Sequence, residues 1–191
     1  MREKILLLGG GGHCKSVIDV IEQEQRFEIL GIIDTQERIG QEVLGYKIIG
    51  TDEELTKFTK QCRYAFVTVG HITSNALRIS LFSLAKEAGF ELPVIVSPLA
   101  YCSQHSRIAE GTILHHFSCV NADAKVGKNC IINSRALIEH DATVEEHSHI
   151  STGAIVNGGT VVEANSFVGS NATTKEYTTL SGFIKAGSLV K

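Results

Sequence analysis

The stretch NSRALIEHDATVEEHSHISTGAI, which runs from Asn133 to Ile155, has an aliphatic residue at every sixth position. The same period continues on both sides, so that eleven hexads follow one another without an insertion. The residue four places after each aliphatic one is always small. This is the hexapeptide signature of a parallel β-helix, in which three hexads form one coil and these two positions face inward. The aliphatic positions are Ile108, Leu114, Val120, Val126, Ile132, Ile138, Val144, Ile150, Val156, Val162 and Val168. Weaker hexads extend the pattern back to Val96 and forward to Leu180, which predicts about five coils.

The chain changes character near Pro93. Before it, short apolar runs alternate with segments of helical spacing, which predicts a parallel sheet with helices between its strands. A short helix is expected to begin at Thr51, where Glu54 completes a capping box. We therefore predict an α/β domain over residues 1–94 and an all-β domain over residues 95–191. The expected strands are 4–8, 29–34, 46–49 and 65–70, and the longer expected helices are 14–25 and 74–88.

The helix expected over residues 74–88 has several apolar residues at helical spacing. We expect these residues to share its buried face. They are Leu77, Leu81, Leu84, Ala85 and Ala88.

Composition narrows the class of protein. The 191 residues carry a net charge of −3, which gives no basic surface for nucleic acid. No apolar run approaches the roughly 20 residues of a membrane span, and the N-terminal apolar run ends in glycines rather than at a signal-peptide cleavage site. Five cysteines without C-x-x-C spacing are typical of the cytoplasm, which is the expected location.

The hexad pattern also gives the direction of the histidines. His140 and His147 occupy corners where successive strands meet, and His149 faces outward from the middle of a flat face. Residues three hexads apart lie above one another at the spacing of neighbouring strands, so Ala122 lies below His140 and Gly158 lies above it. These small neighbours predict an open notch on both sides of the His140 imidazole.

The three histidines do not have the spacing of a zinc site. Hexapeptide carbonic anhydrases hold zinc with three histidines, but at other intervals than those between His140, His147 and His149. We therefore expect no metal, and a zinc hydratase remains an alternative. His147 lies between Asn129 and Asn165 of the neighbouring coils, and we expect it to be an ordinary surface histidine.

The outward positions of the β-helix predict how the chain assembles. Two of its three faces carry apolar outward residues, which suggests that both are buried against neighbours. A closed three-fold ring buries both faces, so we expect a homotrimer. The apolar residues are Ile113, Ile131 and Phe167 on one face and Cys119, Leu137 and Ile155 on the other, whereas the third face carries Arg107, Lys125, Thr143, Val161 and Thr179.

Three motifs carry a resemblance to a known family: LLGGGGHCKSVIDVI (7–21), GIID (31–34), and NSRALIEHDATV followed by HSHISTGA (133–154). With them the chain resembles the sugar O- and N-acyltransferases of the NeuD/PglD type over nearly its whole length. The resemblance implies a Rossmann-like half-domain before a left-handed hexapeptide β-helix, and a trimer that uses acetyl-CoA as acyl donor. The loop 68–78 is longer than its counterpart in this family, and we expect it to affect acceptor recognition.

The resemblance implies roles for residues of the β-helix. His140 matches the family's catalytic base, and Asp141, or else Glu139, would hold its tautomer. The Gly158 amide would stabilise the oxyanion of the tetrahedral intermediate. The other matched or candidate contacts of acetyl-CoA are His149, which would act from the neighbouring subunit, Asn133, which alternatively only turns the corner, and Lys175, which alternatively lies on a solvated face.

The N-terminal glycines bear on the acceptor. Gly10, Gly11 and Gly12 lie between a strand and a helix, where backbone amides can bind phosphate, and Asp34 ends the next strand, where a ribose hydroxyl is often bound. Lys15 replaces the last glycine of a complete G-x-G-x-x-G motif, so a mononucleotide fits better than NAD. The alternative is that the glycines only allow tight helix–strand packing. His13 and Gly70 complete the expected acceptor site.

The expected function is therefore acetyl-CoA-dependent transfer of an acetyl group to the amine, or to a hydroxyl, of a sugar. The resemblance implies a nucleotide-linked amino sugar in surface-glycan biosynthesis as acceptor. The alternatives are a sialic acid O-acetyltransferase and a non-catalytic trimer that binds a nucleotide sugar. The sequence does not decide between N- and O-acylation.

Overall fold

The computed structural model describes residues 2–191 and divides into two compact units. The N-terminal unit contains the chain up to Gly70 together with Ala76–Pro93. The β-helix unit contains Val94–Lys191 and also the short segment His71–Asn75. We call this segment the strap. Nothing in the periodicity of the sequence indicates that the strap belongs with the β-helix.

The N-terminal unit is built on a five-stranded sheet in the order β3-β4-β2-β1-β5. Strands β1, β2, β4 and β5 are parallel, and β3 is antiparallel to β4. The alternation of strands and helices predicted from the sequence is confirmed. The strands are β1 (Glu3–Leu8), β2 (Phe27–Ile33), β3 (Glu42–Val43), β4 (Tyr46–Gly50) and β5 (Tyr64–Val67).

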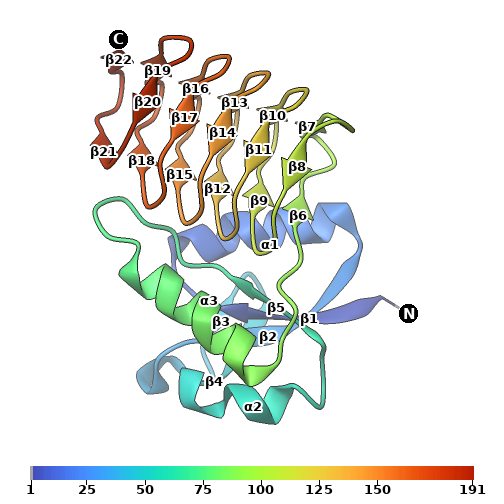
Figure 1. Ribbon diagram of the computed structural model, residues 1–191. Coiled ribbons are helices and arrows are strands. Elements are labelled where there is room, and N and C mark those ends of the chain that lie inside the picture. The colour runs from blue at the N-terminus through green and yellow to red at the C-terminus, as the bar shows by residue number, and fades with distance from the viewer. Residues whose placement is uncertain (1) are drawn as a thin grey trace. The chain divides into compact units, whose positions relative to one another are not determined.

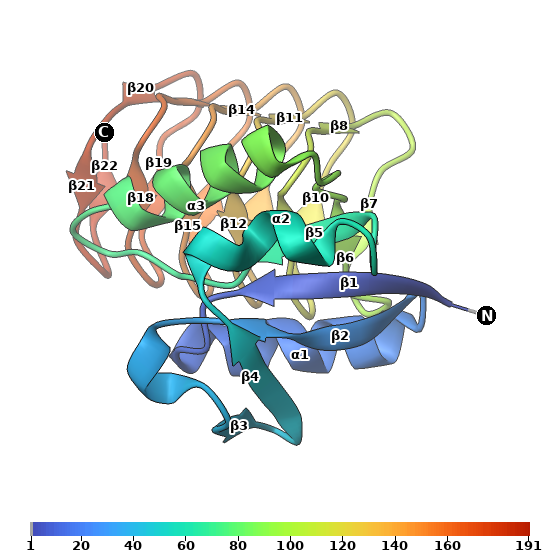
Figure 2. The same ribbon diagram turned by 90° about the horizontal axis from the view of Figure 1, so that it is seen from below.

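Helices cover both faces of this sheet (Figure 2), with α1 (Gly12–Glu24) on one face and α2 (Leu55–Phe58) and α3 (Ala76–Ala88) on the other. Strand β1 is therefore buried on both sides, and Ile5, Leu6, Leu7 and Leu8 are fully buried, as expected for a central parallel strand. The predicted capping box is present, because Thr51 and Glu54 bond each other's backbone at the short helix η2 (Asp52–Glu54). A further short helix, η1, covers Gln36–Arg38.

The buried face predicted for α3 is wrong in part. Leu77 and Leu84 are 58% and 38% exposed. The buried stripe is instead Arg78, Leu81, Phe82 and Ala85, which has the i, i+3, i+4, i+7 spacing of an amphipathic helix. The sequence pattern did not indicate this stripe, because it includes Arg78 and a charged residue is expected to be exposed. Arg78 is 1% exposed, and its guanidinium donates to the carbonyl oxygens of Val67 and Val69 at 2.9 and 2.8 Å.

The β-helix unit contains three parallel sheets of two-residue strands that form the faces of a coil (Figure 1). The parallel β-helix predicted from the hexads is confirmed, and the three sheets are consistent with the left-handed form that the resemblance implies. We name each face by one of its strands. The β15 face contains β6 (Ile95–Val96), β9 (Ile113–Leu114), β12 (Ile131–Ile132), β15 (His149–Ile150), β18 (Phe167–Val168) and β21 (Phe183–Ile184). The β13 face contains β7 (Tyr101–Cys102), β10 (Cys119–Val120), β13 (Leu137–Ile138), β16 (Ile155–Val156), β19 (Thr173–Thr174) and β22 (Leu189–Val190). The β14 face contains β8 (Arg107–Ile108), β11 (Lys125–Val126), β14 (Thr143–Val144), β17 (Val161–Val162) and β20 (Thr179–Leu180).

The register of these sheets explains the period of six. Each strand pairs with the strand three hexads later, as Ile131 does with His149, so identical hexad positions stack. The aliphatic residues fill the interior, and the small residue of each hexad packs among them. The third residue of the corners has a positive φ, as at Asp123 and Asn129, a conformation that Asp, Asn and Gly adopt more readily than other residues.

The β-helix continues further than the hexads predict. Strands β21 and β22 extend it beyond Leu180 to Val190. In this last part the partners are Phe167 and Phe183, and Thr173 and Leu189, which is two residues less than in the other coils. A two-residue corner at Ser181 and Gly182 causes this shift and hides the strands from a strict period of six.

One outward residue of the β15 face is covered within the β-helix unit itself. The strap lies against His149, which is only 7% exposed. The homotrimer expected from the outward residues stays a prediction. The β13 face keeps its outward apolar residues partly exposed. Within residues 2–191 no helix is long and apolar enough to cross a membrane.

Candidate active site

His140 lies on an exposed corner directly after β13. Its Nδ1 donates a hydrogen bond of 2.8 Å to the carboxylate of Asp141. A carboxylate only accepts, so Nδ1 carries the proton and Nε2 is left with the lone pair of a base. The hydrogen bond to Asp141 raises the pKa of His140 above its ordinary value. The pair thus has the geometry of a base whose tautomer is set by a carboxylate.

The structure also decides between the two acidic neighbours of His140. Glu139 accepts a hydrogen bond of 2.8 Å from the Asn121 amide and one of 3.2 Å from the His140 backbone amide. It therefore stabilises the corner, while Asp141 orients the imidazole.

Gly158 lies against the His140 ring in the next coil. A Cβ at Gly158 would be 2.9 Å from His140 Cε1 and 3.0 Å from Nε2, so only glycine leaves room for the imidazole in this position. Within residues 2–191 the Gly158 amide donates no hydrogen bond, whereas the next amide, that of Gly159, donates to the His140 carbonyl at 3.0 Å. A free donor therefore lies beside the basic nitrogen.

The open notch predicted beside His140 is not open on the side of Gly158. The imidazole itself covers Gly158, and the ring of Tyr177 covers Gly159. Tyr177 is 78% exposed, so it is an accessible aromatic surface on the same corner as His140. The register of the hexads could have placed Tyr177 on this corner, since it follows Asp141 at the interval of two coils. The sequence analysis missed Tyr177 because it lies beyond the regular part of the repeat.

His149 points outward from its face, as predicted, but the strap covers it. Its Nδ1 is 2.8 Å from the carbonyl oxygen of His71, and its ring makes edge contacts with the rings of His71 and Phe167 at 5.3 and 5.1 Å. On its other side, Nε2 is 3.2 Å from the side-chain amide of Asn133. His149 is therefore held by its own chain, and its contact with acetyl-CoA stays a prediction.

Asn133 turns the corner, which is one of the two roles that the sequence left open, and its contact with acetyl-CoA stays a prediction. Its Oδ1 accepts the amide of Ser134 at 2.8 Å, which turns the corner, and its Nδ2 faces His149. One amide thus fixes the chain and presents a donor at the corner between the β15 and β13 faces.

The prediction that His147 is a surface histidine is wrong. Its neighbours are as predicted, with Nδ1 3.0 Å from Asn129 Nδ2. However, His147 is 8% exposed, and its carbonyl accepts a hydrogen bond of 3.1 Å from Asn75 of the strap. A segment far away in the sequence closes over this corner, which the hexad pattern alone does not reveal.

Within one chain the predicted residues form two groups. His140, Asp141 and Gly158 lie together at one edge of the β13 face, and Asn133 with His149 lies at its other edge. Lys175 is exposed on the corner of His140, one coil beyond Gly158. The structure does not bring the two groups together in a single chain.

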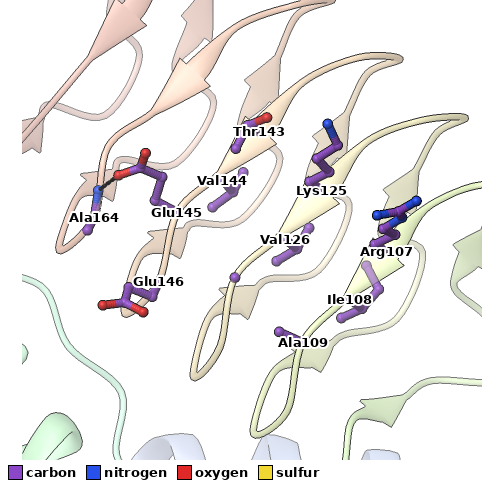
Figure 3. Close-up of a pocket in the computed structure, with 11 residues that line it drawn as sticks. Arg107, Ile108, Ala109, Lys125, Val126, Thr143, Val144, Glu145, Glu146 and Ala164 are labelled. Atoms are coloured by element: carbon purple, nitrogen blue, oxygen red, sulfur yellow. Dashed lines mark hydrogen bonds between the residues drawn. The ribbon is translucent and has the colours of Figure 1, made fainter.

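The β14 face carries an open groove of about 540 Å³ (Figure 3). Arg107, Lys125 and Thr143 follow one another along it, and Glu145 accepts the amide of Ala164 at 2.9 Å. None of the residues expected in the site lines this groove. We interpret it as the polar outer face of the coil.

The N-terminal unit contains a cavity of about 670 Å³ at the glycine-rich turn. Asp34 lies on its wall, where the carboxylate accepts 2.6 Å hydrogen bonds from the Gly10 amide and from Arg38. The Arg38 guanidinium also donates to the Gly10 carbonyl at 3.0 Å. Arg38 was not among the expected residues, because an arginine four positions after the strand-end aspartate has no motif of its own. Asp52 lines the same cavity, and burial, followed by the charge of Asp34, raises its pKa.

The glycines of the turn and its surroundings are required for different physical reasons. A Cβ at Gly10 would be 2.9 Å from the Asp34 carboxylate, so close packing requires this glycine. Nothing lies within 4 Å of a Cβ at Gly11 or Gly12, so packing does not require these two, and they leave the N-terminus of α1 open. Gly70 packs against His13, with the two Cβ positions 3.3 Å apart, which places both expected residues together next to the turn. Such an open helix N-terminus suits an anion.

No group of three or more histidine, cysteine or acidic residues in the described part of the chain, residues 2–191, is arranged to hold a metal ion.

Comparisons with known proteins agree with this architecture. Residues 4–84 match the family model of the PglD N-terminal domain. The whole chain matches 92% of the acetyltransferase domain of PglB from Neisseria gonorrhoeae FA1090, at 27% identity and a TM-score of 0.91. It also matches 93% of that domain in complex with acetyl coenzyme A, at 26% identity and a TM-score of 0.90. PerB from Caulobacter crescentus, in complex with CoA and GDP-perosamine, is 25% identical, with a TM-score of 0.68 over 97% of this chain and 92% of that one. No curated protein matches the chain.

The chain combines an α/β unit with a hexapeptide β-helix that carries a histidine–carboxylate pair on one corner. This combination defines a protein of the sugar acyltransferase class. Within this class the chain is similar to the NeuD/PglD-type family, since residues 4–84 match the model of the PglD N-terminal domain and the full length matches related acetyltransferase structures. The resemblance inferred from the sequence motifs is thereby confirmed.

Proposed function

We propose that this protein transfers the acetyl group of acetyl-CoA to the amine of a nucleotide-linked amino sugar. The observation that carries the proposal is the His140–Asp141 pair with its free Nε2 beside the unbonded Gly158 amide. The related structures support the substrates, because one contains acetyl coenzyme A and another contains CoA with GDP-perosamine.

The residues divide the reaction between them as follows. The acceptor amine attacks the thioester carbonyl carbon while His140 Nε2 takes its proton, and the Gly158 amide donates to the oxyanion that forms. When the intermediate collapses, the carbon–sulfur bond breaks and the imidazolium returns the proton to the CoA sulfur. Asp141 stabilises the imidazolium between the two steps. Lys175, one coil further on the same corner, is proposed to meet the CoA phosphates.

We further propose that the active protein is a homotrimer closed through the β13 faces. Cys119, Leu137 and Ile155 form the apolar outward row that this face leaves partly exposed. The two edges of the face carry Asn133 and His140. In a closed ring each edge lies beside the opposite edge of the next subunit, so Asn133 of one subunit would approach His140 of another.

The assembly is tested by Leu137→Lys. A charge in the centre of the proposed interface has no partner there, so we expect a monomer and complete loss of activity. Light scattering at micromolar concentration measures the mass, and Thr143→Lys on the β14 face is the matched control that should remain trimeric. A wild-type protein that is itself monomeric at this concentration would refute the ring.

The N-terminal cavity is proposed to hold the nucleotide, with its phosphates at the N-terminus of α1. Gly11→Asp tests this, because aspartate is a favourable N-cap residue but repels an anion. We expect the acceptor KM to rise about tenfold or more, roughly 1.4 kcal/mol of repulsion, with no loss of thermal stability. Gly11→Asn has the same shape without the charge and should stay near wild type. Equal KM values for both variants would place the phosphates elsewhere.

The pH profile tests the role of Asp141. Its hydrogen bond raises the pKa of His140, so removing the charge should lower that pKa. The unprotonated base is then present at lower pH. We therefore expect Asp141→Asn to move the acidic limb of the kcat/KM profile to lower pH and to reduce its plateau. An acidic limb that stays in place would mean that another group titrates there.

The function itself is tested by measuring thiol release from acetyl-CoA with a panel of acceptors. UDP- and GDP-linked amino sugars should be acetylated, with the amide identified by mass spectrometry. Acetylation of a sialic acid hydroxyl instead would favour the O-acetyltransferase alternative. Binding of nucleotide sugars without thiol release would favour the non-catalytic trimer, and carbon dioxide hydration with bound zinc the hydratase.

A further inference from the structure

The strap, His71–Asn75, is fastened to the β-helix at two points. At one end, the His71 carbonyl is 2.8 Å from His149 Nδ1, and the His71 ring lies against those of His149 and Phe167. At the other end, the Asn75 amide donates to the His147 carbonyl at 3.1 Å and to Asn165 Oδ1 at 2.9 Å. The strap is therefore held by specific polar contacts, and not only by packing.

The hydrogen bonds that connect His71, His149 and Asn133 have one consistent donor-to-acceptor direction. A backbone carbonyl only accepts, so His149 Nδ1 must carry a proton towards His71. Asn133 Oδ1 accepts the Ser134 amide, which leaves the NH₂ group of Asn133 to face His149. His149 Nε2 therefore accepts from Asn133. Protonation at Nε2 would place two donors against each other.

This direction gives His149 a different task from the one expected. As a neutral imidazole with its proton on Nδ1, it has no N–H directed towards the corner of Asn133. It instead holds the Asn133 amide, whose second hydrogen remains available at the edge of the β13 face. The chain of contacts thus runs from the strap through His149 to Asn133.

We propose that Asn75 and the His71 backbone are positioning elements of the acetyl-CoA site, which fix the tautomer of His149 and, through it, the orientation of Asn133. The inference rests on the proposed function for one part only, namely that the bound thioester is acetyl-CoA. The tautomer of His149 follows from the hydrogen bonds and does not depend on that function. The strap lies within the loop 68–78, which we expect from the sequence to be longer than its counterpart in the family.

The test compares Asn75→Asp with Ile72→Ala in the full-length protein. Aspartate has the shape of asparagine but cannot donate to the His147 carbonyl or to Asn165, so the strap loses its fastening. Ile72 is a strap residue that is 61% exposed, and its substitution is the matched control. We expect Asn75→Asp to raise the KM for acetyl-CoA about tenfold while the acceptor KM changes less than twofold, and Ile72→Ala to change neither.

A spectroscopic readout separates positioning from a general loss of structure. Long-range ¹H–¹⁵N spectra, assigned with His149→Gln, should show His149 protonated at Nδ1 in the wild type and in Ile72→Ala, and a mixture of tautomers in Asn75→Asp. A native His149 signal together with a native acetyl-CoA KM in Asn75→Asp would overturn the inference. So would a rise confined to the acceptor KM. If the protein transfers no acetyl group at all but the tautomer still responds to Asn75, the proposed function fails and the link from strap to histidine remains.

Discussion

His140→Ala lowers kcat by roughly 10²–10⁴, the range for loss of a general base, and leaves the fold and the assembly unchanged. The expected selectivity follows from the position of the side chain. His140 is an exposed corner residue, and its ring contacts Asp141 and covers Gly158 without filling the core. Alanine at this position therefore leaves no cavity inside the coil. Steady-state kinetics with saturating acetyl-CoA measure kcat, and thermal unfolding measures the stability.

A matched control for this prediction is His105→Ala. His105 is also an exposed histidine on the corner between the β13 and β14 faces, two coils before the site, where its ring contacts the Gln104 side chain. It should keep wild-type kinetics. If both variants lose activity to the same extent, the loss comes from the corner in general. If neither loses activity, the base is another group and the proposed mechanism is wrong.

The hexad period allowed much of this site to be predicted. Because the register is regular, it placed His140 on an exposed corner and Gly158 directly beside it, and the structure places them so. The same count named Asn129 as the neighbour of His147. A repeat of this kind converts sequence distance directly into spatial distance, which few folds allow.

The predictions that were wrong or incomplete have a common physical origin. Each depends on a tertiary contact that the periodicity of the sequence does not indicate. The strap reaches His149 across 78 residues of sequence, so neither His147 nor His149 is accessible as the hexads alone predict. Arg78 is a buried cation, bonded to backbone carbonyls, in a stripe where pattern analysis expects apolar residues. Arg38 belongs to the cavity wall only because Asp34 and the Gly10 backbone both bond it. In each case a polar tertiary contact decides the outcome.

Gly158→Ala should reduce kcat about 10²-fold although it adds a single methyl group. The new Cβ would lie 2.9 Å from His140 Cε1 and 3.0 Å from Nε2, so the imidazole has to move away. A displacement of this size in a catalytic group costs on the order of 10²-fold in rate. The cost in stability should be small, because the displaced ring is exposed and can move towards solvent while the backbone around Gly158 keeps its hydrogen bonds. Thermal unfolding should therefore remain close to that of the wild type.

The same substitution in a His140→Ala background shows which group it acts on. If Gly158→Ala works by displacing the imidazole, it should cost little once the imidazole is absent, and the double variant should be about as active as His140→Ala alone. The two effects are then strongly non-additive, as expected for residues in direct contact. If instead Gly158→Ala lowers kcat equally in both backgrounds, the methyl group obstructs the thioester itself. The absence of a side chain at Gly158 would then serve to leave room for the acyl donor, and the contact with His140 would have no role in catalysis.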